Sequence, residues 1–476
     1  MKNIHKILAG LLVLTLGSSC NDFLTVNPKT EVARDALFST EDGFKDAMAG
    51  VYIQMGEDVA YGRELTMTSI EHLVSSWDVT ALTPADQLGQ FNYSDAGAER
   101  VLEGIFNHQY KTISSINAML NEIDAKKAIF SPGIYELIKG ECLALRGLLH
   151  FDMLRLFGPV PSAASAGHRL PPYVTVFSKV SPAPLNYAGF KTALFNDLEE
   201  AEQLLAKSDP FLAYGITDFR NNTYRTKDDF VHYRYLRMNY YAVKAMKARA
   251  YLWFNEPQKA YEQATFVINA KNTDASAKFR LGTSADFAAN DLVLTPEQIF
   301  GLYDFNINTK FVVPTLFKGT DAAVINGQLY GNTGTDTRES NLWITDVQSS
   351  VSRYMFRKYN FTASSTNLMQ DAKQIPMLRL SEMYLIAIET GAQADAQNWW
   401  DAFQTARNVG QSTLPTDTSQ KQALLAKEYR KEFYGEGQAF YAYKRLNAPA
   451  AQITFLPVGV TVDYVPPLPK SETAVN

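Results

Sequence analysis

The segment that most constrains the fold is GIYELIKGECLALRGLLHFDMLRLFGPVP, residues 133–161. Its apolar residues recur at helical spacing in two stripes, one formed by Ile138, Cys142, Leu145, Leu149, Met153 and Leu156 and the other by Leu137, Ala144, Leu148 and Phe151. A helix that is apolar on two sides is packed on two sides. Gly158 and the prolines at 159 and 161 end it. The sequence therefore predicts a central helix covered on both faces.

Other stretches show the same helical spacing. They predict helices at about residues 38–52, 107–124, 186–206, 232–254, 256–270, 376–391, 395–409 and 420–435. Two of the resulting pairs carry small residues where antiparallel helices would meet, namely Ala248, Ala260 and Ala264 in one and Ala402 and Ala406 in the other. Such small residues are typical of tetratricopeptide-like repeats, although the strict period of about 34 residues is lost. We therefore expect divergent helical repeats in one globular body.

Three regions, roughly residues 56–100, 207–230 and 271–375, do not follow this pattern. The last of them contains short extended pieces such as EQIFGLYDF and polar turns such as YGNTGTDTRES. The Pro-rich tail from Val458 onward is also expected to lack regular structure. These regions are predicted to be rich in loops.

The N-terminus has the layout of a secretory signal. Lys2 and Lys6 precede a mainly apolar run, Ile7–Leu16, that is too short for a bilayer span of about 20 residues. Small residues follow, and the run stops at Cys20. We interpret residues 1–19 as a lipoprotein signal peptide and Cys20 as the acylated new N-terminus. The alternative is an ordinary secretory signal with a cysteine there by chance.

Composition limits the partners of the mature chain. A hydrophobic fraction of 46% with 20% charged residues is typical of a globular protein. Loss of Lys2 and Lys6 with the signal takes the formal charge from −5 to −7, which argues against nucleic-acid binding. An acylated Cys20 leaves Cys142 without a disulfide partner, and its helical spacing predicts a buried core residue rather than a reactive thiol.

Motifs for catalysis and metal binding are missing from the sequence. It contains no Gly-x-Ser-x-Gly, P-loop, dinucleotide fingerprint or His-Glu-x-x-His, so we expect no catalytic residue, no metal site and no cofactor. A glycosidase needs two carboxylates in one cleft, but 50 acidic residues make chance pairs certain. Glu199, Glu200 and Glu202 are interpreted as a solvated helix face. Glu432 and Glu436, near Arg430 and Arg445, are interpreted as ion-pairing residues that fix the last helix.

Six segments, in order along nearly the whole chain, carry a family resemblance. They are CNDFLTVNPKTEV, LFSTEDGFKDAMAGVY, GECLALRGLLHFDMLRLFGPVP, IPMLRLSEMYLIAIET, EYRKEFYGEGQAFYAYKR and YVPPLPKSE. Together they resemble the SusD/RagB family of outer-membrane lipoproteins from Bacteroidota. Tyr429, Ala442 and Gln404 depart from residues common in the family, which puts local ion pairs in doubt.

The resemblance implies a mostly α fold with four divergent tetratricopeptide-like helix pairs. The scaffold would occupy roughly residues 37–157, 186–270 and 376–445 of a body spanning 20–476, and the three loop-rich regions would form the ligand face. Family members are not enzymes. They capture a nutrient, commonly a glycan, at the outer membrane and load a SusC-like TonB-dependent transporter, while lipid on Cys20 anchors them. The alternatives are a peptide ligand, a lipid-anchored glycoside hydrolase, and a helical-repeat lipoprotein that scaffolds other envelope proteins without binding a small ligand.

Candidate ligand contacts are the aromatic residues outside the helical stripes, together with nearby polar groups. Sugar rings stack on flat aromatic faces, while polar side chains bind the hydroxyl groups. The candidates are Trp77, Asp78, Phe91, Tyr93, Tyr330, Asn332, Asp336, Arg338 and Trp343. Each ring could equally pack its own loop. If they contact ligand, Trp77→Ala and Trp343→Ala should weaken binding without unfolding the protein.

Overall fold

The computed structural model describes residues 34–164, 167–178, 182–220, 228–307, 316–348, 350–359 and 373–473. The predicted signal peptide and Cys20 lie outside these residues. Within them, every helix is too short or too polar to cross a bilayer.

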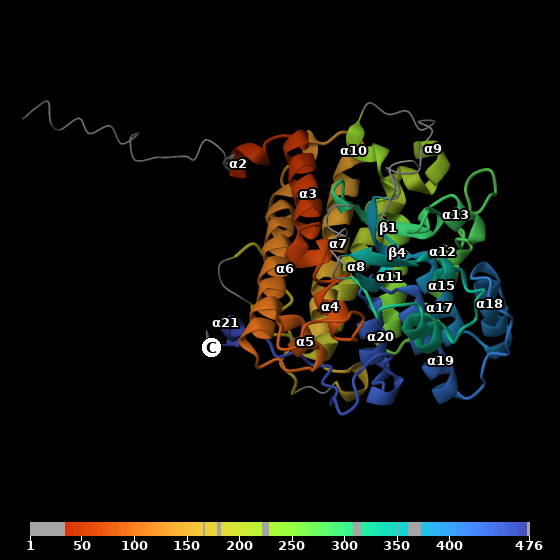
Figure 1. Cartoon of the computed structure of the whole chain (residues 1–476). Helices are drawn as coiled ribbons and strands as arrows, with labels where there is room; N and C mark the ends of the chain where they lie inside the picture. The colour runs from red at the N-terminus through yellow and green to blue at the C-terminus, as the bar shows by residue number, and fades with distance from the viewer. Residues whose placement is uncertain are drawn as a thin grey trace, which may run out of the picture.

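Long helices form the scaffold. They are α3 (Glu41–Met55), α6 (Ala96–Ile123), α7 (Ile134–Phe157), α8 (Tyr187–Ser208), α11 (Tyr240–Trp253), α12 (Pro257–Ile268), α17 (Leu380–Thr390), α18 (Gln393–Ala406), α19 (Thr418–Glu432) and α20 (Gln438–Leu446). From α3 to α18, each of these packs against the next one along the chain. Figure 1 shows α3, α6 and α7 along one edge of the molecule and α18 and α19 at the other. The predicted mostly α fold is confirmed.

Shorter elements connect the long helices. They are α2 (Arg34–Leu37), η2 (Asp58–Gly62), α4 (Ser69–His72), α5 (Pro84–Gly89), η3 (Lys127–Ile129), η4 (Pro161–Ala163), η5 (Pro210–Leu212), α9 (Ile216–Arg220), α10 (Asp229–His232), α13 (Ser284–Ala288), η6 (Thr295–Glu297), η7 (Ile325–Tyr330), α15 (Thr337–Asn341), η8 (Ala450–Gln452) and α21 (Lys470–Thr473). Two small antiparallel sheets complete the described fold. One pairs β1 (Gln298–Tyr303) with β4 (Gln374–Arg379), and the other is the hairpin of β2 (Trp343–Gln348) and β3 (Val351–Phe356).

Helix α7 is the centre of the core, as its two apolar stripes predict. All of its residues except Glu136 and Lys139 are buried. A Cβ atom at Gly140 would lie 2.8 Å from Leu205 Cγ on α8, so the missing side chain lets these two helices approach closely. Cys142 is fully buried and forms no disulfide, and burial raises the pKa of its thiol. Its prediction as a core residue is confirmed.

Three predicted helix starts are wrong. The helix expected from residue 232 begins at Tyr240, because the Asn239 side chain accepts a hydrogen bond from the Ala242 amide and caps it there. The helix expected from residue 376 begins at Leu380, because residues 374–379 pair with β1 as strand β4. In addition, α6 begins at Ala96, about ten residues before the expected start, where Asp95 caps it.

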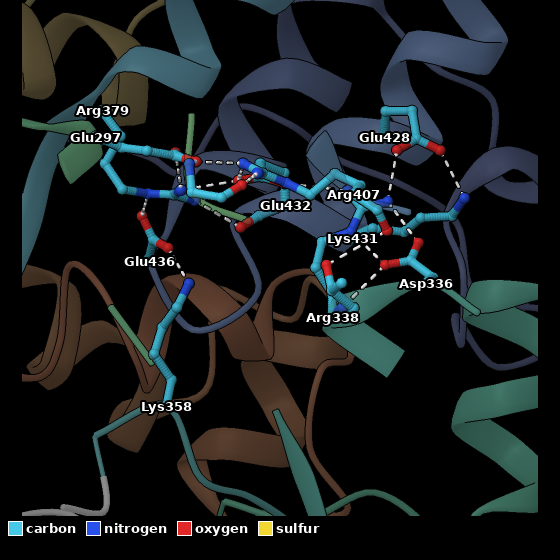
Figure 2. Close-up of polar contacts among 12 residues, drawn as sticks. Glu297, Asp336, Arg338, Lys358, Arg379, Arg407, Glu428, Lys431, Glu432 and Glu436 are labelled. Carbon is cyan, nitrogen blue, oxygen red and sulfur yellow. Dashed lines mark hydrogen bonds and ion pairs between the residues drawn. The ribbon is translucent and has the colours of Figure 1, made fainter. Parts of the chain in front are cut away.

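A buried cluster of charges joins the C-terminal helices to the region with the sheets (Figure 2). Its centre is Glu432 at the end of α19, which lies 2.8 Å from Arg379, 2.7 Å from Arg407 and 3.1 Å from Arg338. All four side chains are almost completely buried. The prediction that Glu432 forms ion pairs is confirmed, but its partners come from β4, the end of α18 and α15 instead of from its own helix.

Further carboxylates complete this cluster. Glu297 binds Arg379 at 2.8 Å and Arg407 at 2.7 Å, while Glu436 binds Arg379 at 2.9 Å and also pairs with Lys358. The predicted neighbours of Glu432 and Glu436 pair elsewhere in the fold, Arg430 with Glu71 and Arg445 with Glu389. We call the set Glu297, Asp336, Arg338, Lys358, Arg379, Arg407, Glu428, Glu432 and Glu436 the Glu432 network.

We expect Glu432→Gln to lower the free energy of unfolding by about 3–5 kcal/mol, because it removes one charge and leaves three buried guanidinium groups short of a partner. Urea denaturation would measure the change. The matched control is Glu199→Gln, which alters an exposed carboxylate on α8 and should leave stability within about 0.5 kcal/mol of the unaltered chain. Equal urea denaturation midpoints for Glu432→Gln and Glu199→Gln would contradict a stabilising role for the Glu432 ion pairs.

The same carboxylate should make the free energy of unfolding depend on pH. Burial raises the pKa of Glu432, but Arg407 and Arg379 outweigh it and hold that pKa well below its usual value of 4.5. Its contribution is therefore fully present above about pH 4.5 and is lost as the pH falls further. The stability difference between the unaltered chain and Glu432→Gln should stay constant from pH 7 to 5 and shrink toward pH 3. A stability difference that stays constant from pH 7 to pH 3 would contradict this role for the Glu432 charge.

Candidate functional site

Trp77 and Trp343 lie together in the structure, but in its interior. Their side chains are 2% and 3% exposed, and their rings both lie about 5 Å from Tyr434, with centroid distances of 5.1 and 5.0 Å. Trp77 Nε1 donates to the Met67 carbonyl at 2.7 Å, and Trp343 stacks on Tyr354. Aromatic partners far along the chain cover these two rings, which agrees with the alternative that each ring packs within the fold.

The predicted group around Tyr330 is also buried. Asp336 and Arg338 pair at 2.6 Å inside the Glu432 network, where Arg338 additionally binds Glu428 and Glu432. The Tyr330 ring is almost fully buried. Only Asn332 of this group is exposed. The polar loop expected to present these side chains instead folds them inward as part of the core.

Phe91 and Tyr93 anchor the C-terminal tail. The Tyr93 hydroxyl donates to the Asp463 carbonyl at 2.6 Å, and the Phe91 ring lies edge-on to Tyr464 at 6.5 Å. Both rings are buried. Their location thus agrees with the alternative that a loop aromatic packs within the fold.

Asp78 lines a large depression, and the neighbouring Trp77, although almost fully buried, lines the smaller hollow beside it. A hollow of about 600 Å³ lies along the Asp78 side chain and is lined by the segment that follows η2, by α4 and α5 and by residues 316–317, with Arg63, Glu64, His72 and Arg353 among the lining groups. A second hollow of about 300 Å³ shares His72, Asp78, Val79 and Ala85 with the first. We call these two joined hollows the Asp78 groove. Its volume falls within the range of small-molecule sites.

Hydrogen bonds across distant segments fix the wall of this groove. Asp78 Oδ2 accepts from the Gly319 amide at 2.7 Å, and its other oxygen lies 2.9 Å from Lys318 Nζ. The Asp78 amide donates in turn to the Phe317 carbonyl at 3.0 Å. The loop after α4 is thereby attached to residues about 240 positions later, and Asp78 has a defined orientation.

The groove offers both donors and acceptors. Burial, together with the charge of Arg63, lowers the pKa of His72 to about 4, so the ring is neutral at neutral pH. The Nδ1 atom of His72 is buried without a hydrogen-bond partner in the described structure. The guanidinium of Arg63 likewise makes no hydrogen bond or ion pair with the side chains that the structure describes. These groups are available to a polar ligand.

The chemistry of the described site is that of binding polar groups. Nowhere in the described ranges do three or more His, Cys, Asp or Glu side chains come together as metal ligands. Glu64 accepts hydrogen bonds from Thr68, at 2.9 Å, and from Ser69. The sequence flagged the loop-rich region 56–100 but singled out its aromatic residues, so Arg63 and His72 were missed. Neither belongs to a motif that a single sequence reveals.

Comparison with known proteins agrees with this fold. A protein-family sequence model described as "SusD family" matches residues 221–461, and a second family model, described as "Starch-binding associating with outer membrane", matches residues 22–206. No curated protein matches the chain.

Three solved structures illustrate the likeness. A SusD superfamily protein from Bacteroides thetaiotaomicron is 20% identical, with 90% of this chain and 92% of that chain covered and a TM-score of 0.65. A putative sugar binding protein from Bacteroides vulgatus is 19% identical, with 92% and 97% covered and a TM-score of 0.66. A laminarin binding SusD-like protein is 16% identical, with 91% and 97% covered and a TM-score of 0.59. At these identities the likeness establishes the fold.

The burial of the two tryptophans changes the expected outcome of replacing them. Trp77→Ala and Trp343→Ala should each lower the free energy of unfolding by about 3–5 kcal/mol, because each leaves a cavity in the aromatic cluster. Thermal melting would show it as a clear drop in Tm. Leu82→Ala is the control, since Leu82 is a highly exposed apolar side chain. Unchanged melting of both tryptophan variants would contradict their core role.

Proposed function

The chain belongs to the SusD family, and from this premise we propose that it is a non-catalytic cell-surface protein that captures a glycan in the Asp78 groove. The observation that carries the proposal is the groove itself, which combines a ligand-sized volume with fixed polar groups. The laminarin-binding structure with the same fold supports the choice of a carbohydrate.

The chemistry of the groove suits a neutral polyhydroxyl ligand. The guanidinium of Arg63 donates to hydroxyl oxygens, while the carboxylates of Asp78 and Glu64 accept from hydroxyl groups. A neutral His72 offers one donor and one acceptor on its ring. The groove therefore carries both positive and negative side chains, and an uncharged sugar can form hydrogen bonds with both.

The proposal extends to the cellular role. Lipid on Cys20 would anchor the protein to the outer membrane, and a SusC-like TonB-dependent transporter would receive the captured glycan. The signal-like start of the sequence and the family membership support both steps. Co-purification of a transporter barrel with the full-length chain from membranes would test the partnership.

The ligand class can be tested with a chain that starts at residue 21. We would titrate it by calorimetry with maltoheptaose, laminarihexaose, cellohexaose, xylohexaose, mannohexaose and a casein digest, and analyse each mixture by chromatography. Binding of an oligosaccharide without cleavage would support the proposal. Cleavage would identify a hydrolase instead, and binding of the digest alone would identify a peptide-binding protein.

We expect Arg63→Ala to weaken binding of the oligosaccharide about tenfold or more, because a hydrogen bond to a charged group contributes about 1.5–3 kcal/mol. Calorimetry would measure the affinity, and an unchanged Tm would show that the fold is intact. Arg169→Ala, at an exposed arginine outside the groove, is the matched control. Equal affinity of both variants would place the ligand elsewhere.

A further inference from the structure

A second cavity, outside the Asp78 groove, has a different character. It measures about 710 Å³ and lies between the C-terminal half of α3, the segment around α10 and the end of β1. Tyr52, Ile53, Asp229, Tyr233, Arg237 and Tyr303 are among its lining residues. We call it the Tyr233 pocket. It is richer in aromatic rings than the Asp78 groove.

Two tyrosine rings at this pocket face solvent to an unusual extent. Tyr233 is 58% exposed and Tyr303 is 48% exposed, and the neighbouring Ile53 is also well exposed. Gathered apolar side chains on a protein surface commonly mark a binding site. A tyrosine ring presents a flat apolar face together with a polar hydroxyl, and this combination suits a sugar ring.

The polar group of the pocket is Arg237, which its neighbours hold in place. Its guanidinium carbon lies 4.7 Å from the Tyr52 ring centre and 4.0 Å from that of Phe230, and its Nη1 donates to the Phe230 carbonyl at 3.1 Å. Nε is 3.2 Å from Glu141 Oε2. The buried Nη2 has no hydrogen-bond partner in the described part of the chain. An unmade bond of this kind costs about 1–3 kcal/mol, which a ligand oxygen would recover.

The charges around the pocket favour a neutral ligand. Asp229 and Asp304 line it, and Glu141 already lies beside Arg237. Glu141 also pairs with Arg234, so the lining itself holds two acidic residues and one guanidinium and offers an anionic ligand no net positive charge. A hydroxyl-bearing ligand can instead accept from Arg237 and donate to the exposed carboxylate of Asp229.

We propose that the Tyr233 pocket is a second carbohydrate site, which binds a neutral sugar unit between its exposed tyrosine rings and the Arg237 guanidinium. The choice of ligand class rests on the proposed function, whereas the site itself rests on the pocket. The C–H face of the sugar packs on Tyr233 and Tyr303, and a hydroxyl oxygen accepts from Arg237 Nη2.

The two sites lie close enough to serve one glycan chain. Gly56 lines the Tyr233 pocket and Arg63 lines the Asp78 groove, with η2 between them. Seven residues of chain span at most about 25 Å, which limits the distance between these two Cα atoms. A polysaccharide that reaches both sites gains avidity, because its second contact is intramolecular.

The test is to measure how many molecules of a short oligosaccharide bind to one protein chain. Calorimetry of the chain from residue 21 would use the same five oligosaccharides and compare the unaltered protein with Tyr233→Ala/Tyr303→Ala and with Arg63→Ala. The control is Phe266→Ala, which removes an aromatic ring of similar exposure on α12, outside both sites. Since the two tyrosine rings are exposed, we expect an unchanged Tm for the tyrosine variant.

We expect two sites on the unaltered chain and on the Phe266 control, and one site on each of the other variants. Binding of the parent polysaccharide should weaken at least tenfold in the tyrosine variant, because avidity is lost. One site that survives the tyrosine changes and is lost in Arg63→Ala would overturn the second site alone. One site that survives in Arg63→Ala and is lost in the tyrosine variant would support the Tyr233 pocket and overturn the Asp78 groove. If none of the five oligosaccharides binds, both proposals are wrong.

Discussion

The ion pairs of Glu432 are the constraint on which the C-terminal half of the structure depends. One carboxylate at the end of α19 is shared by guanidinium groups from α15, β4 and the end of α18. Buried charges are tolerated only when every partner is in place, since an unpaired one costs several kcal/mol. These four elements must therefore assemble together, and a region without helical periodicity is attached firmly to the helical scaffold.

The helical scaffold was largely predictable because its signal is local. The two stripes of α7 specify a helix covered on both sides, and the structure buries both. The boundary between β4 and α17 was not predictable in the same way. Residues 374–379 form a short, mainly apolar run that leads directly into an apolar helix, and short apolar runs fit either a strand or a helix. Pairing with β1, about 75 residues earlier, decides the outcome.

The site was less predictable because burial depends on partners that the local sequence does not show. Trp77 sits in a polar stretch and resembles an exposed ring, yet Tyr434 and Phe356 cover it from distant parts of the chain. Asp78, the next residue, does reach the surface and lines the groove. The prediction thus included the loop that carries Asp78 to the groove, but it favoured large rings and left out Arg63, which lines the same cavity.

The buried residues of the predicted site have a structural connection to the groove. Tyr434 follows Glu432 by two residues, its hydroxyl donates to the Ser76 carbonyl, and its ring packs on Trp77. Trp77 in turn directly precedes Asp78. The ion pairs that fix the end of α19 therefore also fix the aromatic cluster beneath the groove wall. Packing of the Trp77 ring on Tyr434 therefore restricts the position of Asp78 at the groove wall. For the glycan site that we propose, a rigid wall lowers the entropy cost of binding.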